Sequence, residues 1–310
     1  MLNAKAFGGL LKDAFRDFKE DKAQRLGAAL AYYSIFSVGP LLLITVAIVG
    51  LFFGEASARQ EIVGTFDRVI GPTGAEALNG LMESASRPRA GILATIIGFL
   101  TLIVGAMGVV HQLKDAMNTV WEVELKERKG IKAKAKGLAK DYAWPFALVL
   151  AVGFLLLVSL VMSSALSVVG KFLGNNLPGG AAVWLVVNFL LSLAVITLLF
   201  AIMFKALPDA EVAWKDVWLG AIFTAVLFTV GQFLVGIYLG RSSTVSAYGA
   251  TSSLVVFLVW VYYSAQIFLF GAELTQAYAN RYGSKVQPDE DAVPVTEEAR
   301  RQRGEGGRPA

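Results

Sequence analysis

The chain of 310 residues contains no cysteine and a single histidine, His111. Without cysteine it can form no disulfide and can offer no thiolate ligand to a metal. A zinc or two-metal hydrolase would then need an almost purely carboxylate ligand set. The sequence also lacks a P-loop, a nucleophile elbow and an H-E-x-x-H pattern. We therefore expect no enzyme activity, no cofactor and no metal site.

Charged residues are scarce as well. They make up 17% of the chain, against 55% hydrophobic residues, and the mean hydropathy is +0.59. A soluble domain is usually about 25% charged. The composition therefore favours a membrane protein.

Six long runs carry no Asp, Glu, Lys or Arg, and each exceeds the roughly 20 apolar residues that a helix needs to cross a bilayer. They predict an all-α integral membrane protein with six transmembrane helices, at about 31–53, 90–113, 144–169, 181–204, 217–239 and 250–273. Of the 28 Lys and Arg residues, 22 fall before the first span, in the second and fourth loops, or after the last span. Because positive charge is retained on the cytoplasmic side, both termini are expected in the cytoplasm of a bacterium, with the spans in its inner membrane.

Three segments outside the predicted spans of the six-helix domain, residues 31–275, have distinctive sequences. Apolar residues at helical spacing over 3–27 predict an amphipathic helix on the inner membrane surface, in an N-terminal segment (1–30) without signal-peptide character. A merely solvated charged helix is the alternative. Residues 54–89 hold two apolar stripes around "GPTG" and predict two short external helices. Residues 284–310 have almost no large apolar side chains and predict a disordered cytoplasmic tail.

The second internal loop, 114–141, is strongly basic, with a few apolar residues between its cations. Nucleic-acid binding is one interpretation of such a segment. Contact with anionic headgroups of the inner leaflet is the favoured one, because the loop is tethered between two spans at that surface. The candidate lipid contacts are Lys126, Arg128, Lys129, Lys132, Lys134 and Lys136.

Amides inside the predicted spans form the first group of candidate functional residues: Gln266, Gln232 and Asn188. Buried amides in membranes usually bond between helices, so packing is one interpretation. A polar path for a substrate or for water is the other. Pro40, halfway along the first span, predicts a kink that serves either packing or gating.

A second group is predicted at the cytoplasmic boundary. Glu273 ends the sixth span two helical turns after Gln266, so both leave the helix on one face, and Gln266 lies about 10 Å deeper. At that boundary a carboxylate can stay hydrated. Topology predicts the same depth for His111, Lys114, Lys205, Tyr32 and Tyr33. The group is either a vestibule, in which Glu273 pairs with Lys205 or Lys114, or ordinary interfacial anchoring.

Four stretches in order resemble the YihY/BrkB family of bacterial inner-membrane proteins: "AALAYYSIFSVGPLLL" (28–43), "MNTVWEV" (117–123), "LPDAEVAWKDVWLGA" (207–221) and "YGATSSLVVFLVWVYYSAQIFLFGAEL" (248–274). The resemblance covers about residues 10–282 and implies a six-helix protein of the inner membrane. Members have carried the label ribonuclease BN, and the scarcity of His and Cys argues against that activity. The family's recurrent positions fall on Tyr32, Tyr33, Pro40, Trp121, Pro208, Asp209, Trp214, Tyr248, Gly249, Trp260, Gly271 and Glu273. No catalytic role comes with any of them.

The expected function is that of a transporter or permease for a lipid, a lipid-linked solute or a small ionic solute. It rests on the proline in the first span, the amides within the spans and the face that carries Glu273. A non-transporting envelope scaffold, or virulence-associated membrane factor, is the alternative, and a membrane-surface enzyme comes third.

Overall fold

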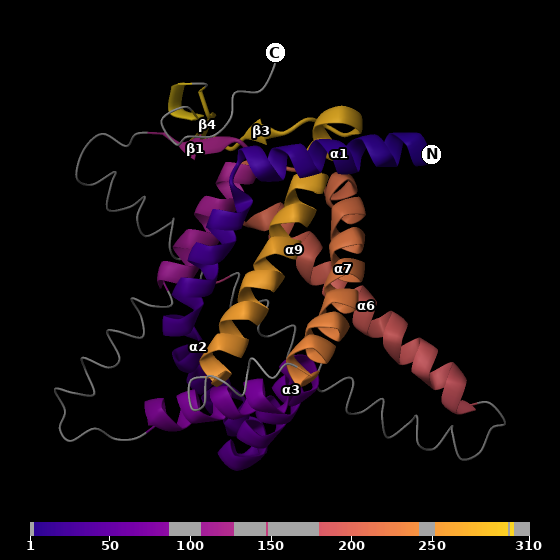
Figure 1. The fold of residues 1–310 in the computed structure, drawn as a ribbon. Coiled ribbons are helices and arrows are strands. Elements are labelled where there is room, and N and C mark those ends of the chain that lie inside the picture. The colour runs from indigo at the N-terminus through magenta and orange to yellow at the C-terminus, as the bar shows by residue number, and fades with distance from the viewer. Residues whose placement is uncertain are drawn as a thin grey trace. The chain divides into compact units, whose positions relative to one another are not determined.

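The computed structural model describes residues 3–86, 107–126, 147, 180–241, 252–296 and 298–300. These residues are mostly helical (Figure 1). The helices are α1 (Ala4–Glu20), α2 (Ala23–Phe53), α3 (Glu55–Ser86), α6 (Gly180–Ala206), α7 (Trp214–Arg241) and α9 (Ser252–Tyr282). Four short strands accompany them: β1 (Val123–Leu125), β2 (Ala210–Glu211), β3 (Gln287–Pro288) and β4 (Ala292–Pro294).

Three of the described helices are long and apolar enough to cross a membrane. The qualifying stretches are Val186–Ala206 of α6, Trp214–Leu234 of α7 and Val255–Tyr282 of α9. They match the fourth, fifth and sixth predicted spans, and the first predicted span lies within α2. Residues 90–106 of the second span, and all of the third except residue 147, lie outside the described residues. The count of six therefore stays a prediction.

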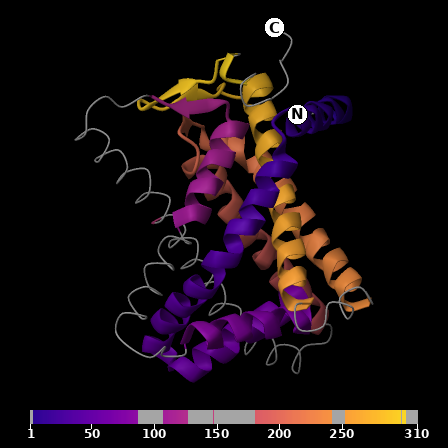
Figure 2. The same cartoon turned by 60° about the vertical axis from the view of Figure 1, so that its left-hand side comes forward.

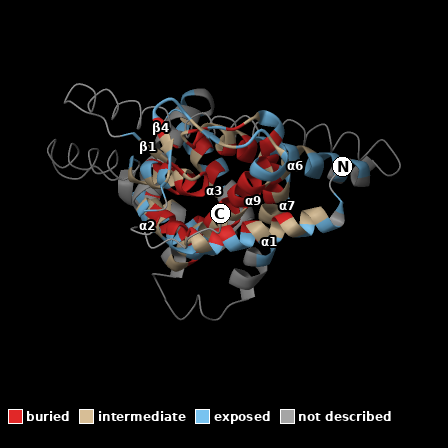
Figure 3. Cartoon of the chain, turned by 90° about the horizontal axis from the view of Figure 1, so that it is seen from above, coloured by how far each residue is buried: buried red, intermediate tan, exposed pale blue. Residues whose placement is uncertain are grey.

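The chain divides into two compact units, each considered by itself. Unit 1 comprises Met1–Phe15, Met117–Leu227 and Gly271–Thr296, and unit 2 comprises Arg16–Ala116, Phe228–Phe270 and Glu297–Ala310. Figure 3 shows buried residues, in red, along α9, which contributes to both units.

Unit 1 contains two small antiparallel sheets. Strand β1 pairs with β4, with Leu125 opposite Ala292, and β2 pairs with β3, with Ala210 opposite Pro288. Figures 1 and 2 both show these strands gathered beside the C-terminal end of α9. The fold is therefore mostly helical rather than purely so.

The predicted disorder from residue 284 onward is wrong for residues 284–296. This segment forms β3 and β4, whose backbone groups pair with earlier parts of the chain. Such pairing needs backbone donors and acceptors but no run of apolar side chains, so a polar composition did not prevent it. Residues 301–310 lie outside the described residues.

The predicted N-terminal amphipathic helix corresponds to α1 but ends at Glu20 rather than at residue 27. Lys22 takes a left-handed conformation with φ 52°, and α2 begins directly after it. In unit 1, Leu10 and Ala14 of α1 are fully buried, and Phe7 packs edge-on against Phe223 of α7 with ring centroids 6.0 Å apart. Other parts of the protein therefore cover some of the apolar face of α1, which the sequence analysis placed against the membrane.

In unit 2, α2 ends at Gly54, which adopts φ 84° and donates its N–H to the carbonyl of Gly50 at 2.9 Å. A positive φ costs glycine little, which allows α3 to begin at once. Side chains of α3 then pack with those of α2 and α9 in one apolar cluster: Val46, Ala58, Ile62, Met82 and Phe257. The segment predicted to rest on the bundle therefore does pack on it.

The helical segment α3 extends from Glu55 to Ser86, whereas the sequence predicted two helices with a turn at 71–74. However, Arg59 Nε donates to Asn79 Oδ1 at 3.0 Å. A straight helix would separate these two residues by about 30 Å. The segment therefore folds back on itself between them, as the two predicted helices required.

Candidate functional site

Helices α7 and α9 interlock in unit 1 through two matched Gly-x-x-x-Thr pairs. A Cβ added at Gly220 of α7 would collide with the hydroxyl of Thr275 on α9, and one added at Gly271 of α9 would collide with the hydroxyl of Thr224 on α7. Each missing Cβ makes room for the threonine of the other helix, a close approach typical of membrane helices. Residue 275 is thus level with 220, and 271 with 224, so the two helices run antiparallel.

The threonines in this crossing are also internally satisfied. The hydroxyl of Thr224 donates to the carbonyl of Gly220 at 2.6 Å, and that of Thr275 donates to the carbonyl of Gly271 at 2.7 Å. Both are bonds to the residue four positions earlier in the same helix. The crossing therefore buries two hydroxyls without leaving either unsatisfied.

Glu273 lies between Gly271 and Thr275 and is 0% exposed. It is two positions from each of them, about 200° around the helix, so it leaves α9 on the side turned away from α7. Helix α9 continues for nine residues beyond Glu273, to Tyr282, and its span-like stretch includes all of them. The expectation that water hydrates this carboxylate is therefore corrected, because protein encloses the side chain. Where the sixth span ends stays a prediction.

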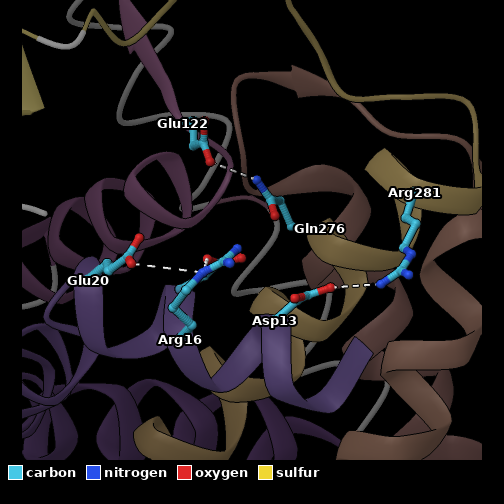
Figure 4. A network of polar contacts seen from close by, with 7 residues as sticks. Asp13, Arg16, Glu20, Glu122, Gln276 and Arg281 are labelled. Carbon is cyan, nitrogen blue, oxygen red and sulfur yellow. Dashed lines mark hydrogen bonds and ion pairs between the residues drawn. The ribbon is translucent and has the colours of Figure 1, made fainter. Parts of the chain in front are cut away.

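The next turn of α9 adds a second buried polar contact that the sequence did not single out. Gln276, 2% exposed, donates from Nε2 to the Glu122 carboxylate oxygen Oε1 at 3.1 Å (Figure 4). Glu122 has φ 57° in the turn that follows helical residues 107–120. Left-handed conformations at non-glycine residues mark constrained positions. No sequence signal linked these two residues, because they lie in distant segments.

Trp121, beside Glu122, is 1% exposed, and its ring centroid lies 6.3 Å from that of Phe204 in α6. Its indole Nε1 has no hydrogen-bond partner within the described part of the chain. Trp121 belongs to the "MNTVWEV" stretch, so this motif supplies both a buried aromatic anchor and the acceptor for Gln276.

Polar contacts also fix the ends of the helices in unit 1. Asn118 and Asp209 bond twice at 2.8 Å, through the Asn118 amide to Asp209 Oδ2 and through the Asp209 backbone N–H to Asn118 Oδ1. Arg281 near the end of α9 pairs with Asp13 of α1 at 2.9 Å (Figure 4). These contacts join "MNTVWEV" to "LPDAEVAWKDVWLGA" and the end of α9 to α1.

Gln266 lies in unit 2, on the part of α9 that meets α2. A Cβ added at Gly27 of α2 would collide with its amide nitrogen. Both polar atoms of the amide are buried, and neither has a hydrogen-bond partner among the residues that the structure describes. The structure thus brings the amide into close contact with α2, and its hydrogen-bond partner stays a prediction.

The other predicted candidates are distributed over both units. In unit 2, Tyr33 lies against Gly108 and edge-on to Tyr32, both tyrosines are exposed, His111 is exposed, Lys114 is buried and Gln232 is half-buried. In unit 1, Asn188 is exposed and Lys205 half-buried. The predicted ring of groups at one depth, with a Glu273–Lys205 or Glu273–Lys114 pair, stays a prediction. So does the hinge at Pro40, which lies within the continuous helix α2.

Of the predicted lipid contacts, only Lys126 is described. Its Nζ donates to the carbonyl of Glu290 at 2.6 Å, and its backbone N–H donates to the carbonyl of Asp291 at 2.9 Å. The C-terminal segment thus holds this lysine. The remaining five lie outside the described residues: Arg128, Lys129, Lys132, Lys134 and Lys136.

Comparison with known proteins gives a consistent result. A family model described as virulence factor BrkB matches residues 14–296, a range that ends just after β4. A UPF0761 membrane protein of Acinetobacter baylyi is 24% identical over 273 residues, covering 88% of this chain and 62% of the relative. One from Pseudomonas aeruginosa (strain LESB58) is 28% identical over 260 residues, covering 83% and 59%. The chain spans about 60% of the length of these relatives, and no solved structure matches it.

Proposed function

Since this chain belongs to the virulence factor BrkB family and is a membrane protein, we propose that it works as a transporter or permease of the bacterial inner membrane. The proposed cargo is a lipid, a lipid-linked solute or a small ionic solute. The relatives are named as membrane proteins and are longer than this chain, so the activity of the whole protein is part of the proposal.

Glu273 is the observation that carries the proposal. Its side chain is 0% exposed, and it lies inside a helix that can cross a membrane. An ionisable residue at membrane depth is costly to bury, and such residues usually mark paths for ions, protons or substrates. A carboxylate there can take up a proton or hold a cation without any cofactor.

The packing around Glu273 restricts where a path could run. The reciprocal contacts of Gly220 with Thr275 and of Gly271 with Thr224 fill the seam between α7 and α9. Glu273 leaves α9 on another side, and Gln276 follows it by three residues, which places the two side chains about 60° apart around the helix. The proposed path therefore passes the Glu273 and Gln276 side of α9.

The test is flux through liposomes that contain the purified full-length chain, measured for inorganic ions and for labelled phospholipids. We expect Glu273→Gln to reduce flux to the level of empty vesicles while the protein still folds. Glu290→Gln is the matched control, because the Glu290 side chain is exposed and only its backbone carbonyl bonds Lys126. Wild-type flux in Glu273→Gln would remove Glu273 from the path.

The scaffold alternative predicts a different outcome of the same experiment. The ordered C-terminal strands and the acidic turn Asp289–Asp291 offer an exposed surface in unit 1. If no tested solute moves and Glu273→Gln leaves every property unchanged, this alternative replaces the transporter proposal.

The proposed orientation has its own test, because the natural chain has no cysteine. Glu211 is exposed on β2, in the loop between α6 and α7 that the positive-inside rule assigns to the cytoplasm. A membrane-impermeant thiol reagent should label Glu211→Cys in inverted inner-membrane vesicles and not in intact spheroplasts. Labelling in spheroplasts would reverse the orientation.

A further inference from the structure

One face of α7 carries large apolar side chains that the rest of unit 1 leaves exposed. Trp214, Trp218, Ile222 and Val226 follow each other at intervals of four residues and are 40% to 51% exposed. Neighbouring positions around the same helix are fully packed, with Val217, Ala221, Thr224 and Ala225 all 0% exposed. Because four-residue spacing keeps side chains on one side of a helix, the exposed set forms one stripe.

The chemistry of this stripe changes along the helix. It begins with two tryptophans, whose rings lie 6.5 Å apart, with exposed Lys215 between them in the sequence. It continues with the aliphatic residues Ile222 and Val226. Tryptophan and lysine are enriched where membranes meet water, and aliphatic side chains suit the hydrocarbon core. An interface with a second protein copy would not require this order.

The C-terminal end of α9 lies level with the start of the stripe and also carries residues typical of a membrane interface. The backbone N–H of Ser284, just after α9, donates to the Asp216 carboxylate in the first turn of α7 at 2.9 Å. Two residues before Ser284, Tyr282 is 47% exposed, and the Arg281 guanidinium lies 5.5 Å from the centre of its ring. An exposed tyrosine and a cation thus end α9 at the level where tryptophans begin α7.

We infer that the stripe from Trp214 to Val226 faces the bilayer, with the two tryptophans among the lipid headgroups and Ile222 and Val226 among the acyl chains. The close packing of α7 against α9 then gives the depth of Glu273 in the membrane. Since Gly271 is level with Thr224 and Thr275 with Gly220, Glu273 is level with Ile222. It therefore lies about 6 Å deeper in the membrane than Trp218 and about 12 Å deeper than Trp214.

This inference does not depend on transport and can be tested without it. The absence of cysteine allows one nitroxide spin label at a time, at Trp218→Cys, Ile222→Cys or Val226→Cys. Glu211→Cys, on exposed β2, is the aqueous control. The labelled full-length chain is placed in vesicles of phosphatidylethanolamine and phosphatidylglycerol. Collisions with oxygen, which concentrates in lipid, and with a water-soluble nickel chelate are then measured by electron paramagnetic resonance.

Oxygen collisions should rise and nickel collisions should fall from 218 to 222 to 226, with a depth increase of about 6 Å at each step. Glu211→Cys should report water throughout. Shielding of Ile222→Cys from both reagents would overturn the inference. Dipolar broadening that disappears on dilution with unlabelled chain would then identify a second copy as the cover, and its absence would identify another segment of this chain. Nickel access at Ile222→Cys equal to that at Glu211→Cys would also overturn it, by placing this level in water.

Discussion

Helix α9 approaches its neighbouring helices closely over several glycines, and two of these contacts treat their polar atoms differently. In unit 1, Thr224 and Thr275 occupy the space that two glycines leave, and each hydroxyl bonds a carbonyl of its own helix. In unit 2, the amide of Gln266 lies over Gly27 of α2, and neither of its polar atoms has a hydrogen-bond partner in the described residues. In both places the missing Cβ of a glycine lets two helices come close. Among the described residues, hydrogen bonds satisfy the polar atoms only in the threonine contact.

The largest expected effect on stability comes from adding a methyl group at a glycine in the contact between α7 and α9. In Gly271→Ala the new Cβ would meet the Thr224 hydroxyl and two of its carbons at 2.9 and 3.0 Å. Because packed helices cannot separate without losing other contacts, we expect a loss of about 2–3 kcal/mol in the free energy of unfolding, measured by denaturant titration in detergent micelles. The matched control is Gly80→Ala in α3, where an added Cβ meets nothing within 4 Å. Equal stabilities for the two variants would mean that the α7–α9 contact is not tight.

The second prediction is an increase, rather than a decrease, in the free energy of unfolding. Gln266→Leu replaces an amide without a partner in the described residues by an apolar side chain of similar size. We expect a gain of about 1–2 kcal/mol in the free energy of unfolding, since a buried polar group without a partner costs about that much. The same titration measures it, and Gln24→Leu, at an exposed position of α2, serves as the control. A loss of stability in Gln266→Leu would show that the amide has a partner in the folded protein.

A smaller loss is expected from Thr275→Val. This change keeps the shape that fits Gly220 and removes only the hydroxyl that bonds the carbonyl of Gly271. A side-chain hydrogen bond in a membrane protein contributes about 0.6 kcal/mol on average, so we expect a loss of this order. Opposite signs for Thr275→Val and Gln266→Leu would sharpen the contrast between the two contacts. A gain in both would remove it.

The smallest effect is expected for Gly27→Ala. The new Cβ would meet the end of the Gln266 side chain, which can rotate away, and alanine favours the helix by about 1 kcal/mol over glycine. We expect a net change of less than about 1 kcal/mol. In a Gln266→Ala background the obstacle is gone, so Gly27→Ala should become stabilising. A loss as large as that of Gly271→Ala would show that the Gln266 side chain is held firmly in place.

Apolar runs were sufficient to predict α6, α7 and most of α9, because long membrane helices need continuous hydrophobicity. The predicted span ends at residue 273, whereas helix α9 continues to Tyr282 through residues that include several polar side chains. Contacts made only in the folded chain support these residues, such as Gln276 with Glu122 and Arg281 with Asp13. The burial of Glu273 was missed as well, because it depends on packing that an apolar run does not show.

Glu273 and Gln266 were both selected from the sequence because a polar side chain in an apolar run stands out. Glu122 and Trp121 were not selected as site residues, since they follow a helix end where polar residues are ordinary. Strands β1 to β4 have two or three residues each, too few for any periodicity, and their partners lie far away in the chain. Only the folded structure brings these residues together.

The pairing of β4 with β1 and of β3 with β2 has a consequence for how this protein is made. A ribosome completes the last strands only after the segments they pair with have been synthesised. Helices α6 and α7 therefore emerge, and can enter the membrane, while β1 and β2 still lack their partners. Folding can begin during synthesis with the N-terminal parts of a chain, and incomplete states leave strand edges unpaired. A chain whose synthesis stopped before residues 284–296 would therefore contain the helices of unit 1 while β1 and β2 lacked their partners.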